Sequence, residues 1–143
     1  MSVSFKDLLS KPLDEVKKPP PLPAGTWFGV IRKHEFELSR EKKTPNVRFT
    51  FGMTGPGEDI DPSSLDGVDY LAKTVSKTFW LTPDAEYRLK EFLEDLNIST
   101  TGRTFFEALP ETVNLSVMME ITQRSSKDGK DIFNDVNKVT GVQ

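Results

Sequence analysis

The sequence contains little of what metal and acid–base chemistry usually needs. It has no cysteine and a single histidine, His34. Disulfide bonds, thiolate metal sites and a cysteine nucleophile are therefore excluded. One imidazole without positioned partners forms neither a zinc site nor a catalytic triad, so we expect His34 to be a surface or structural residue. The absence of cysteine also fits a protein of the reducing cytoplasm.

Two further patterns are missing or incomplete. No GxxxxGKS/T or GxGxxG loop, which would hold phosphates, occurs in the chain. Segment 59–63 (DIDPS) begins like a calcium loop, but Ser64 stands at the glycine position and Tyr70 at the twelfth position. Carboxylates within one loop do not form the convergent cage of a two-metal nuclease. We therefore expect a protein that is not an enzyme and that binds no cofactor or metal.

Long apolar runs and a basic surplus are also absent. The N-terminal residues lack the apolar run of a signal peptide, and no segment is long and apolar enough to span a membrane, so we expect no membrane partner. The net charge is −3 and the pI is about 5.3, whereas domains that bind nucleic acid are often basic. Binding depends on the local electrostatic field in a groove, so the positions of the charges, rather than the net charge, decide whether the protein can bind nucleic acid.

The chain begins with a leader, residues 1–24, whose composition differs from the rest. Ser4 can cap a single helical turn at residues 5–9. The run 17–23 (KKPPPLP) then disfavours helix and favours polyproline II. We interpret the leader as a stiff linker or as an arm that lies on the domain. A docking peptide for a proline-reading partner is the alternative.

Alternation of apolar and polar residues predicts five strands after the leader. Their ranges are about 27–38, 47–53, 73–81, 113–121 and 132–139. The polar segment 39–44 links the first two strands as a hairpin, and a turn at an Asp-Gly pair, Asp128 and Gly129, links the last two. Residues 52–72, rich in Gly, Pro, Ser and Asp, are expected to form a long surface loop.

One helix is expected, at residues 82–96. Thr82 suits the N-cap and Pro83 the first helical position, and acidic residues follow at the positive end of the helix dipole. The apolar residues recur at the spacing of one buried face: Ala85, Leu89, Phe92, Leu93 and Leu96. A second short turn is expected around residues 104–109, ending before Pro110.

The predicted order is strand, strand, strand, helix, strand, strand. A single sizeable helix between the third and fourth of five strands is the arrangement of the OB fold, a partly open Greek-key barrel. We therefore predict a mainly β protein, with a five-stranded OB-type β-barrel over residues 25–143 as its one domain. An open α+β sandwich with the same order of elements is the alternative.

Basic residues collect where an OB barrel binds its ligand, on the second and third strands and on the loops beside them. The candidate nucleic-acid-binding cations are Arg32, Lys33, Arg40, Lys42, Lys43, Arg48, Lys77, Arg124, Lys127 and Lys130. Phosphate contacts are expected from the two loops, that is from Arg40, Lys42, Lys43, Lys127 and Lys130. Acidic residues concentrate elsewhere, in loop 52–72 and on helix 82–96. Because Glu and Asp also occur in both basic loops, an ordinary solvated hairpin tip is the alternative for each.

Binding of single strands without sequence preference also needs flat aromatic surfaces on which bases stack, at about 1–3 kcal/mol per base. Trp80 is the best candidate. It shares its strand parity with Ser76 and Thr78, and it should therefore face away from Phe79 and the core.

Two other aromatic residues are candidates for stacking. Trp27 has the opposite parity to Phe28, which we expect in the core together with the even-numbered apolar residues of its strand. Phe133 lies close to the basic tip of the last hairpin. Phe49 and Phe51 are interpreted as core residues. For each of the three candidates, a place in the core is the alternative.

Several segments together resemble a known family: 7–9 (DLL), 11–12 (KP), 19–23 (PPPLP), 22–27 (LPAGTW), 82–85 (TPDA) and 88–93 (RLKEFL). They are similar to segments of phage-encoded single-stranded DNA-binding proteins with an OB-like barrel. The resemblance implies a role in phage DNA replication or recombination, in the host cytoplasm, beside other replication or recombination proteins. Many members end in an acidic tail that recruits partners, whereas this sequence ends in 137–143 (NKVTGVQ). Recruitment through a tail is therefore not expected.

The sequence thus predicts a non-catalytic protein that binds single-stranded DNA through stacked bases and phosphate contacts. Stacking and phosphate contacts serve RNA equally, so both nucleic acids stay open. A phage structural or assembly protein that uses the barrel and the Pro-rich leader for protein contacts is the alternative function. A small nuclease has no set of residues in its favour.

Overall fold

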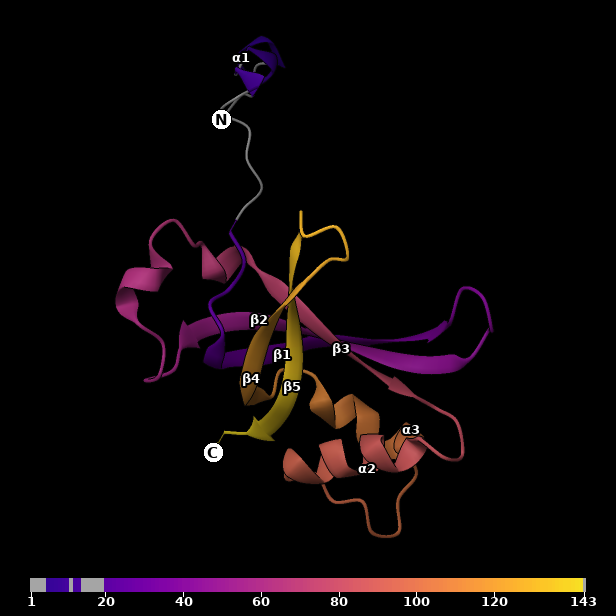
Figure 1. The fold of residues 1–143 in the computed structure, drawn as a ribbon. Helices are drawn as coiled ribbons and strands as arrows, with labels where there is room; N and C mark the ends of the chain where they lie inside the picture. Colours follow the sequence, from indigo (N-terminus) through magenta and orange to yellow (C-terminus); the bar gives the residue numbers. More distant parts are fainter. Residues whose placement is uncertain (1–4, 11, 14–19, 143) are drawn as a thin grey trace.

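The computed structural model describes residues 5–10, 12–13 and 20–142 (Figure 1). Its strands are β1 (Gly25–Leu38), β2 (Pro45–Pro56), β3 (Thr74–Trp80), β4 (Ser116–Ser125) and β5 (Ile132–Gly141). Its short helices are α1 (Phe5–Leu9), α2 (Glu86–Asp95) and α3 (Phe105–Ala108), with 3-10 turns η2 (Pro62–Leu65), η3 (Tyr70–Ala72) and η4 (Leu109–Thr112). The mainly β fold predicted from the sequence is confirmed.

All five strands belong to one antiparallel sheet in the order β3-β2-β1-β4-β5. The sheet is not closed into a barrel, because its end strands β3 and β5 pair only with β2 and β4. A side chain spans the gap between them instead. Nζ of Lys77 on β3 donates to the carbonyl oxygens of Val136 (3.1 Å) and Asn137 (3.5 Å) on β5.

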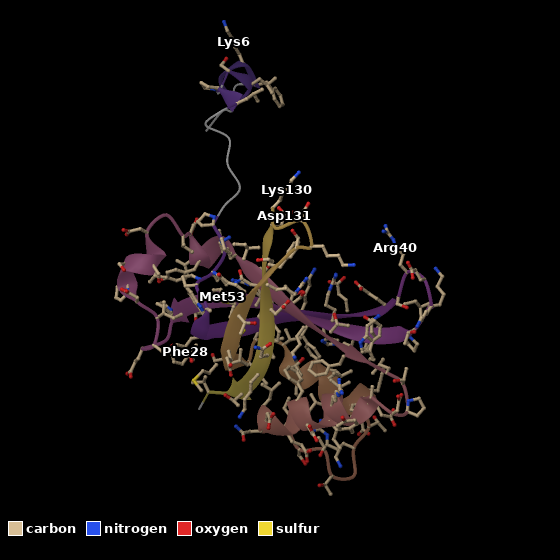
Figure 2. The ribbon with its side chains drawn as sticks, in the orientation of Figure 1. Lys6, Phe28, Arg40, Met53, Lys130 and Asp131 are labelled. Atoms are coloured by element: carbon tan, nitrogen blue, oxygen red, sulfur yellow. The ribbon has the colours of Figure 1, made fainter. Side chains whose placement is uncertain are left out.

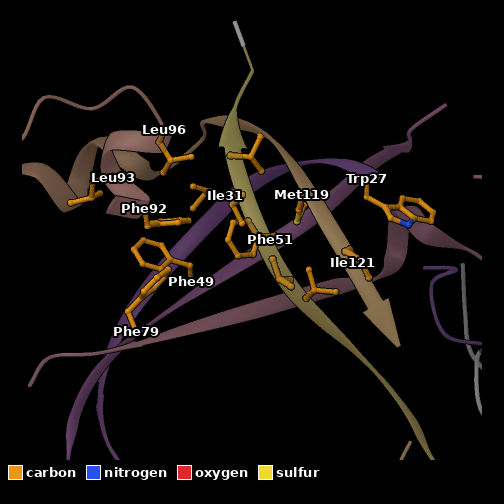
Figure 3. Packing of buried hydrophobic residues seen from close by; sticks show 14 of the residues in the cluster. Trp27, Ile31, Phe49, Phe51, Phe79, Phe92, Leu93, Leu96, Met119 and Ile121 are labelled. Atoms are coloured by element: carbon orange, nitrogen blue, oxygen red, sulfur yellow. The ribbon is translucent and has the colours of Figure 1, made fainter. Parts of the chain in front are cut away.

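The core extends along the sheet from α2, which supplies Phe92 and Leu93, to Trp27 (Figure 3). On β2 the alternate residues Val47, Phe49, Phe51 and Met53 are all buried, as the alternation predicts. Phe49 also belongs to an aromatic cluster with Phe79 of β3 and Phe92 of α2, whose ring centroids lie 4.7–5.8 Å apart. This cluster joins α2 to the sheet.

The expected parity of β1 is wrong in the first half of the strand. Trp27 and Ile31 are buried there, whereas Phe28 is partly exposed. The pairing of β1 with β2 is irregular between Ile31 and Lys33, because Arg32 is an extra residue without a partner on β2. As a result, odd-numbered side chains face inward before Arg32 and even-numbered side chains face inward after it. Beyond it Phe36 pairs with Val47 on the inner side, as expected, but Phe36 is exposed whereas Val47 is buried.

The helices follow the predicted pattern with shifted ends. Leu89, Phe92 and Leu93 form the buried face of α2, as expected. The helix begins at Glu86, so the prediction of an N-cap at Thr82 is wrong. Residues 82–85 form a separate turn instead, a conformation that Pro83 favours, and the carbonyl of Thr82 accepts from the N–H groups that follow.

The second short turn is confirmed as α3 and η4. Thr104 and Glu107 form a complete capping box at the start of α3, each side chain accepting from the other residue's backbone N–H. Pro110 lies inside η4 rather than after it, because a proline is tolerated in the first turn of a helix. The expected surface loop contains η2 and η3, and β2 continues into its first residues.

The end of the leader is part of the core. Leu22 is buried although the sequence placed it before the domain, and the indole N–H of Trp27 donates to the carbonyl of Pro23 at 2.9 Å. Figure 1 shows α1 apart from the sheet, with its Phe5 and Leu9 exposed. The predicted cap at Ser4 and the first three residues of the run 17–23 lie outside the described residues. Across the part of the chain that the structure describes, no helix is long and apolar enough to cross a membrane.

Candidate nucleic-acid interface

The outer face of β3 carries Trp80. Thr74, Ser76, Thr78 and Trp80 alternate along this face and are exposed, whereas the residues between them turn inward. Trp80 is 43% exposed. It therefore presents aromatic surface to solvent on the side of the sheet that the strand parity predicted.

A basic hairpin tip, residues 40–43, stands beside Trp80. Ser39 and Thr44 clamp this loop: the N–H of Ser39 donates to the carbonyl of Thr44 (2.9 Å), and the N–H of Thr44 donates to the Ser39 hydroxyl (2.8 Å). Lys43 closes the turn in the left-handed region, with φ 54°. The clamp holds the exposed side chains of Arg40, Lys42 and Lys43 on a short, well-defined loop.

The tip of the β4–β5 hairpin, residues 127–130, repeats this construction. The N–H of Ser126 donates to the carbonyl of Asp131 (2.9 Å), and the N–H of Asp131 donates to the Ser126 hydroxyl (3.1 Å). Gly129 supplies the positive φ, 72°, that the turn requires. Asp128 accepts hydrogen bonds from the Ser126 hydroxyl and the N–H of Lys130, which lower the pKa of its carboxyl. Lys127 and Lys130 are exposed.

Trp80 lies between two surface hollows. One, of about 610 Å³, is lined by residues of the β1–β2 tip and of the turn before α2: Ser39, Arg40, Glu41, Lys42, Thr44, Thr82, Asp84 and Ala85. The other, of about 540 Å³, is lined by the end of β1 and the outer face of the sheet: Glu37, Leu38, Ser39, Arg40, Lys43, Asn46, Arg48 and Thr78. We call Trp80, Arg40, Lys42 and Lys43 the Trp80 site.

The cations of the Trp80 site differ from those on the sheet itself. Within the described residues, no carboxylate forms an ion pair with Arg40, Lys42 or Lys43. Arg48 lies 3.0 Å from Glu37 and 3.6 Å from Glu35. Local carboxylates thus neutralise Arg48 on the sheet, whereas they form no ion pair with the three cations of the tip in the part of the chain that the structure describes.

Lys33 is the second neutralised cation of the face, with Nζ 3.1 Å from Oε1 of Glu35. Its hydrogen bond and charge, with the charge of Arg48 beside them, lower the pKa of Glu35. The carboxylate is therefore ionised at neutral pH and competes with any phosphate for both cations.

Phe133 lies at the other hairpin tip and is 44% exposed. Arg124, its partner across the β4–β5 ladder, places its guanidinium 5.1 Å from the centre of the ring. Nε of Arg124 also donates to Asp135 at 3.0 Å. Arg124 is thus paired rather than free, and Phe133 retains exposed ring surface next to Lys130.

Two of the predicted contacts do not belong to this interface. Trp27 is 0% exposed, so it offers no surface on which a base could stack. The extra residue in β1 places the odd-numbered side chains of the first half of the strand, Trp27 among them, on the inner face. Lys77 has the parity of the buried residues of β3, and its ammonium group bonds the carbonyls of β5. Burial first, and then the charge of Arg88, lower the pKa of Lys77, against the opposing effect of Asp135.

Arg32 remains exposed, and its side chain lies against Gly52 of β2. A Cβ atom at position 52 would overlap the guanidinium group, so the glycine makes room for it. The extra residue of β1 therefore supplies a cation on the outer face, some distance along the strand from the hairpin tip.

The charges are separated over the molecule. Figure 2 shows Arg40 and Lys130 projecting from two different ends of the structure, so the two basic tips are not adjacent. The acidic loop with η2 and η3 lies at the other end of the sheet from the β1–β2 tip (Figure 1), whereas Asp84, in the turn before α2, lines the same hollow as Arg40 and Lys42. The sequence-based expectation of one cationic groove with both basic tips on its rim stays a prediction.

The acidic loop uses its carboxylates for local structure. Asp59 accepts from the N–H and hydroxyl of Thr26, and Asp61 caps η2 by accepting from the N–H of Ser63. Within the described ranges, no group of His, Asp and Glu side chains could hold a metal ion. The ring of His34 packs beside Phe36 and Phe49, at 5.6 and 6.1 Å.

Sequence reasoning missed two features of the interface. Lys73, just before β3, lines the same hollow as Phe133, about 550 Å³ in volume. The leader residues Pro20 and Pro21 form part of that hollow as well. In the sequence, only the alternation along β3 indicated the exposed row Thr74, Ser76 and Thr78. Nothing in the sequence near the leader indicates that it lies beside β5.

No protein-family model matches this chain, and no curated protein is similar to it.

Proposed function

We propose that this chain binds single-stranded DNA without marked sequence preference and without chemistry. The observation that carries the proposal is the exposed indole of Trp80 next to the cations of the β1–β2 tip, which form no ion pair within the described residues. A base stacks on an exposed aromatic ring whatever its identity, and flanking cations attract the backbone phosphates. The geometry supplies both parts in one place.

The OB-type interpretation supports the same proposal. The five antiparallel strands have the order β3-β2-β1-β4-β5, and α2 lies between β3 and β4 in the chain. OB folds bind oligonucleotides on the face of their second and third strands and on the loops that join strands 1–2 and 4–5. We assign Trp80 and both basic tips to these positions. A role in phage replication or recombination is part of the proposal and derives from the sequence resemblance.

Tryptophan fluorescence tests the proposal well because the chain has only two tryptophans. Trp27 is fully buried and cannot stack on a base, so quenching by a nucleic acid reports on Trp80. We expect an unstructured oligodeoxythymidine to quench the signal and a matched duplex to do so far less. Oligouridine forms the third arm and measures the preference between DNA and RNA.

Variants at position 80 separate binding from folding. Trp80→Ala should weaken single-strand binding by about 1–3 kcal/mol, the usual contribution of one stacked base. Trp80→Phe keeps an aromatic ring and should bind better than Trp80→Ala, while its remaining tryptophan should not be quenched. Absence of single-strand binding by the wild type contradicts the proposal. A Trp80→Ala protein that unfolds, with unchanged affinity per folded molecule, would make Trp80 a structural residue.

The second candidate function is a phage structural or assembly protein. One observation favours it: Phe5, Leu9 and Leu13 of the leader recur every four residues and are all strongly exposed. Such an arm could pack on another protein. Under this function the basic tips are solvated loops, and reversing their charges leaves assembly unchanged.

A further inference from the structure

The hollow beside Phe133 has the composition of a second nucleotide site. It has a volume of about 550 Å³ and combines an exposed aromatic ring with two cations, Lys73 and Lys130. Within the described residues neither lysine forms an ion pair. Asp131 also lies on the rim. We call Phe133, Lys73 and Lys130 the Phe133 site.

The leader completes the walls of this hollow. Pro20 and Pro21 line it, and Leu22, the next residue, is anchored in the core. The backbone of Leu22 is hydrogen-bonded to Asn134, which neighbours Phe133 on β5. The two prolines are therefore held beside the aromatic ring by contacts within the domain.

Strand β3 connects the Phe133 site to the Trp80 site. Lys73 directly precedes β3, and Trp80 is its last residue. The seven residues of the strand span about 23 Å at ~3.3 Å per residue. Between the two ends the outer face shows Thr74, Ser76 and Thr78, whose exposed hydroxyl groups can donate to phosphate oxygens without reading sequence.

We infer that one single strand occupies both sites, running along the hydroxyl row of β3 from Trp80 to Phe133. This inference rests on the proposed function and adds a path and a minimum length to it. At ~3.4 Å per nucleotide, the spacing of a stacked strand, about seven nucleotides cover the distance between the sites. Shorter oligonucleotides reach one site only, whereas longer ones gain the contacts of both.

A length series with quenching of Trp80 tests the inference. Two oligodeoxythymidines are compared, of about three and about twelve nucleotides, which lie below and above the length needed to span the sites. Because Phe133 does not fluoresce measurably beside tryptophan, the signal reports on the Trp80 site at both lengths. Phe133→Ala should weaken binding of the long strand by roughly ten-fold, the loss of one stacked base, and leave the short strand unchanged.

Other variants make the result specific. Lys73→Glu should act as Phe133→Ala does, and it remains informative if the aromatic variant does not fold. Phe106→Ala is the matched control, because Phe106 is an exposed phenylalanine on α3, outside the proposed path. It should bind both lengths as the wild type does. Trp80→Ala should weaken binding of both lengths.

The possible failures are distinguishable. If the wild type binds neither length, the proposed function is wrong. If the wild type binds, but Phe133→Ala and Lys73→Glu change neither length or change both equally, the proposed function stands and the inferred path is overturned. A loss confined to the long strand supports the path.

Discussion

Leu22 tests whether the leader belongs to the folded domain. Its side chain is 1% exposed. Its N–H donates to Oδ1 of Asn134 (2.9 Å), and its carbonyl accepts from Nδ2 of Asn134 (2.9 Å) and Nε2 of Gln123 (2.8 Å). The amide of Asn134 thus pairs with the leader as the backbone of a neighbouring strand would. We predict that Leu22→Ala strongly destabilises the protein.

The size of the effect follows from this burial. Transfer of a leucine side chain from water to the core contributes about 1.5–3 kcal/mol. Truncation to alanine also leaves a cavity that its neighbours fill only in part, which brings the usual cost to about 2–5 kcal/mol. We therefore expect the free energy of unfolding to fall by about 3 kcal/mol.

Leu13→Ala is the matched control because Leu13 lies in the same leader and is 87% exposed. Its effect should stay within about 0.5 kcal/mol. Urea unfolding of both variants, in a Trp80→Phe background, can be followed by the fluorescence of Trp27, whose indole bonds the adjacent Pro23. Equal stability of the two variants would refute the reasoning and place the start of the domain at Gly25, as the sequence predicted.

Two further predictions concern charged side chains. Reversing Lys42 and Lys43 to Glu should weaken single-strand binding and flatten its salt dependence. Three to five phosphate contacts give the wild type a slope of about −2 to −3.5 in log K against log salt. Lys90→Glu on α2 is the control, and an equal loss of affinity in both variants would contradict the assignment. Lys77 has a lowered pKa in the folded protein, so the folded state releases this proton before the unfolded state does, and stability should rise as pH increases from the folded pKa toward the unfolded value near 10.5. Denaturation at several alkaline pH values should show this rise in the wild type relative to Lys77→Met, and parallel curves would contradict it.

The exposure of Trp80 could be predicted from the sequence because β3 pairs with β2 without any irregularity. In such a strand the side chains alternate strictly, and one correctly placed residue fixes the others. The same reasoning failed for Trp27. The pairing of β1 shifts between Ile31 and Lys33, and an extra residue moves every side chain on one side of it to the other face. Nothing in the local composition marks that position.

Lys77 shows a different limit of sequence reasoning. A lysine between polar neighbours is expected in solvent, and its parity with Val75 and Phe79 was the only contrary signal. Because β5 is an end strand, carbonyl groups on its outer side have no ladder partner, and the approach of β3 brings Lys77 within reach of two of them. An ammonium group that bonds these carbonyls satisfies them at the expense of its own hydration, which the lowered pKa of Lys77 reflects. That arrangement depends on tertiary structure alone.

The distribution of ion pairs limits what electrostatics can contribute to binding. Lys33, Arg48 and Arg124 are each held by a carboxylate within the described residues, so a phosphate gains such a cation only by displacing that carboxylate. The exposed cations of the two tips need no such exchange. With Arg32 and Lys73, which also form no ion pair within the described residues, these seven cations give at most a slope of about −4.9 at ~0.7 per contact. A measured slope clearly steeper than this would mean that the paired cations change partners on binding, and that the outer face of the sheet rearranges with the strand in place.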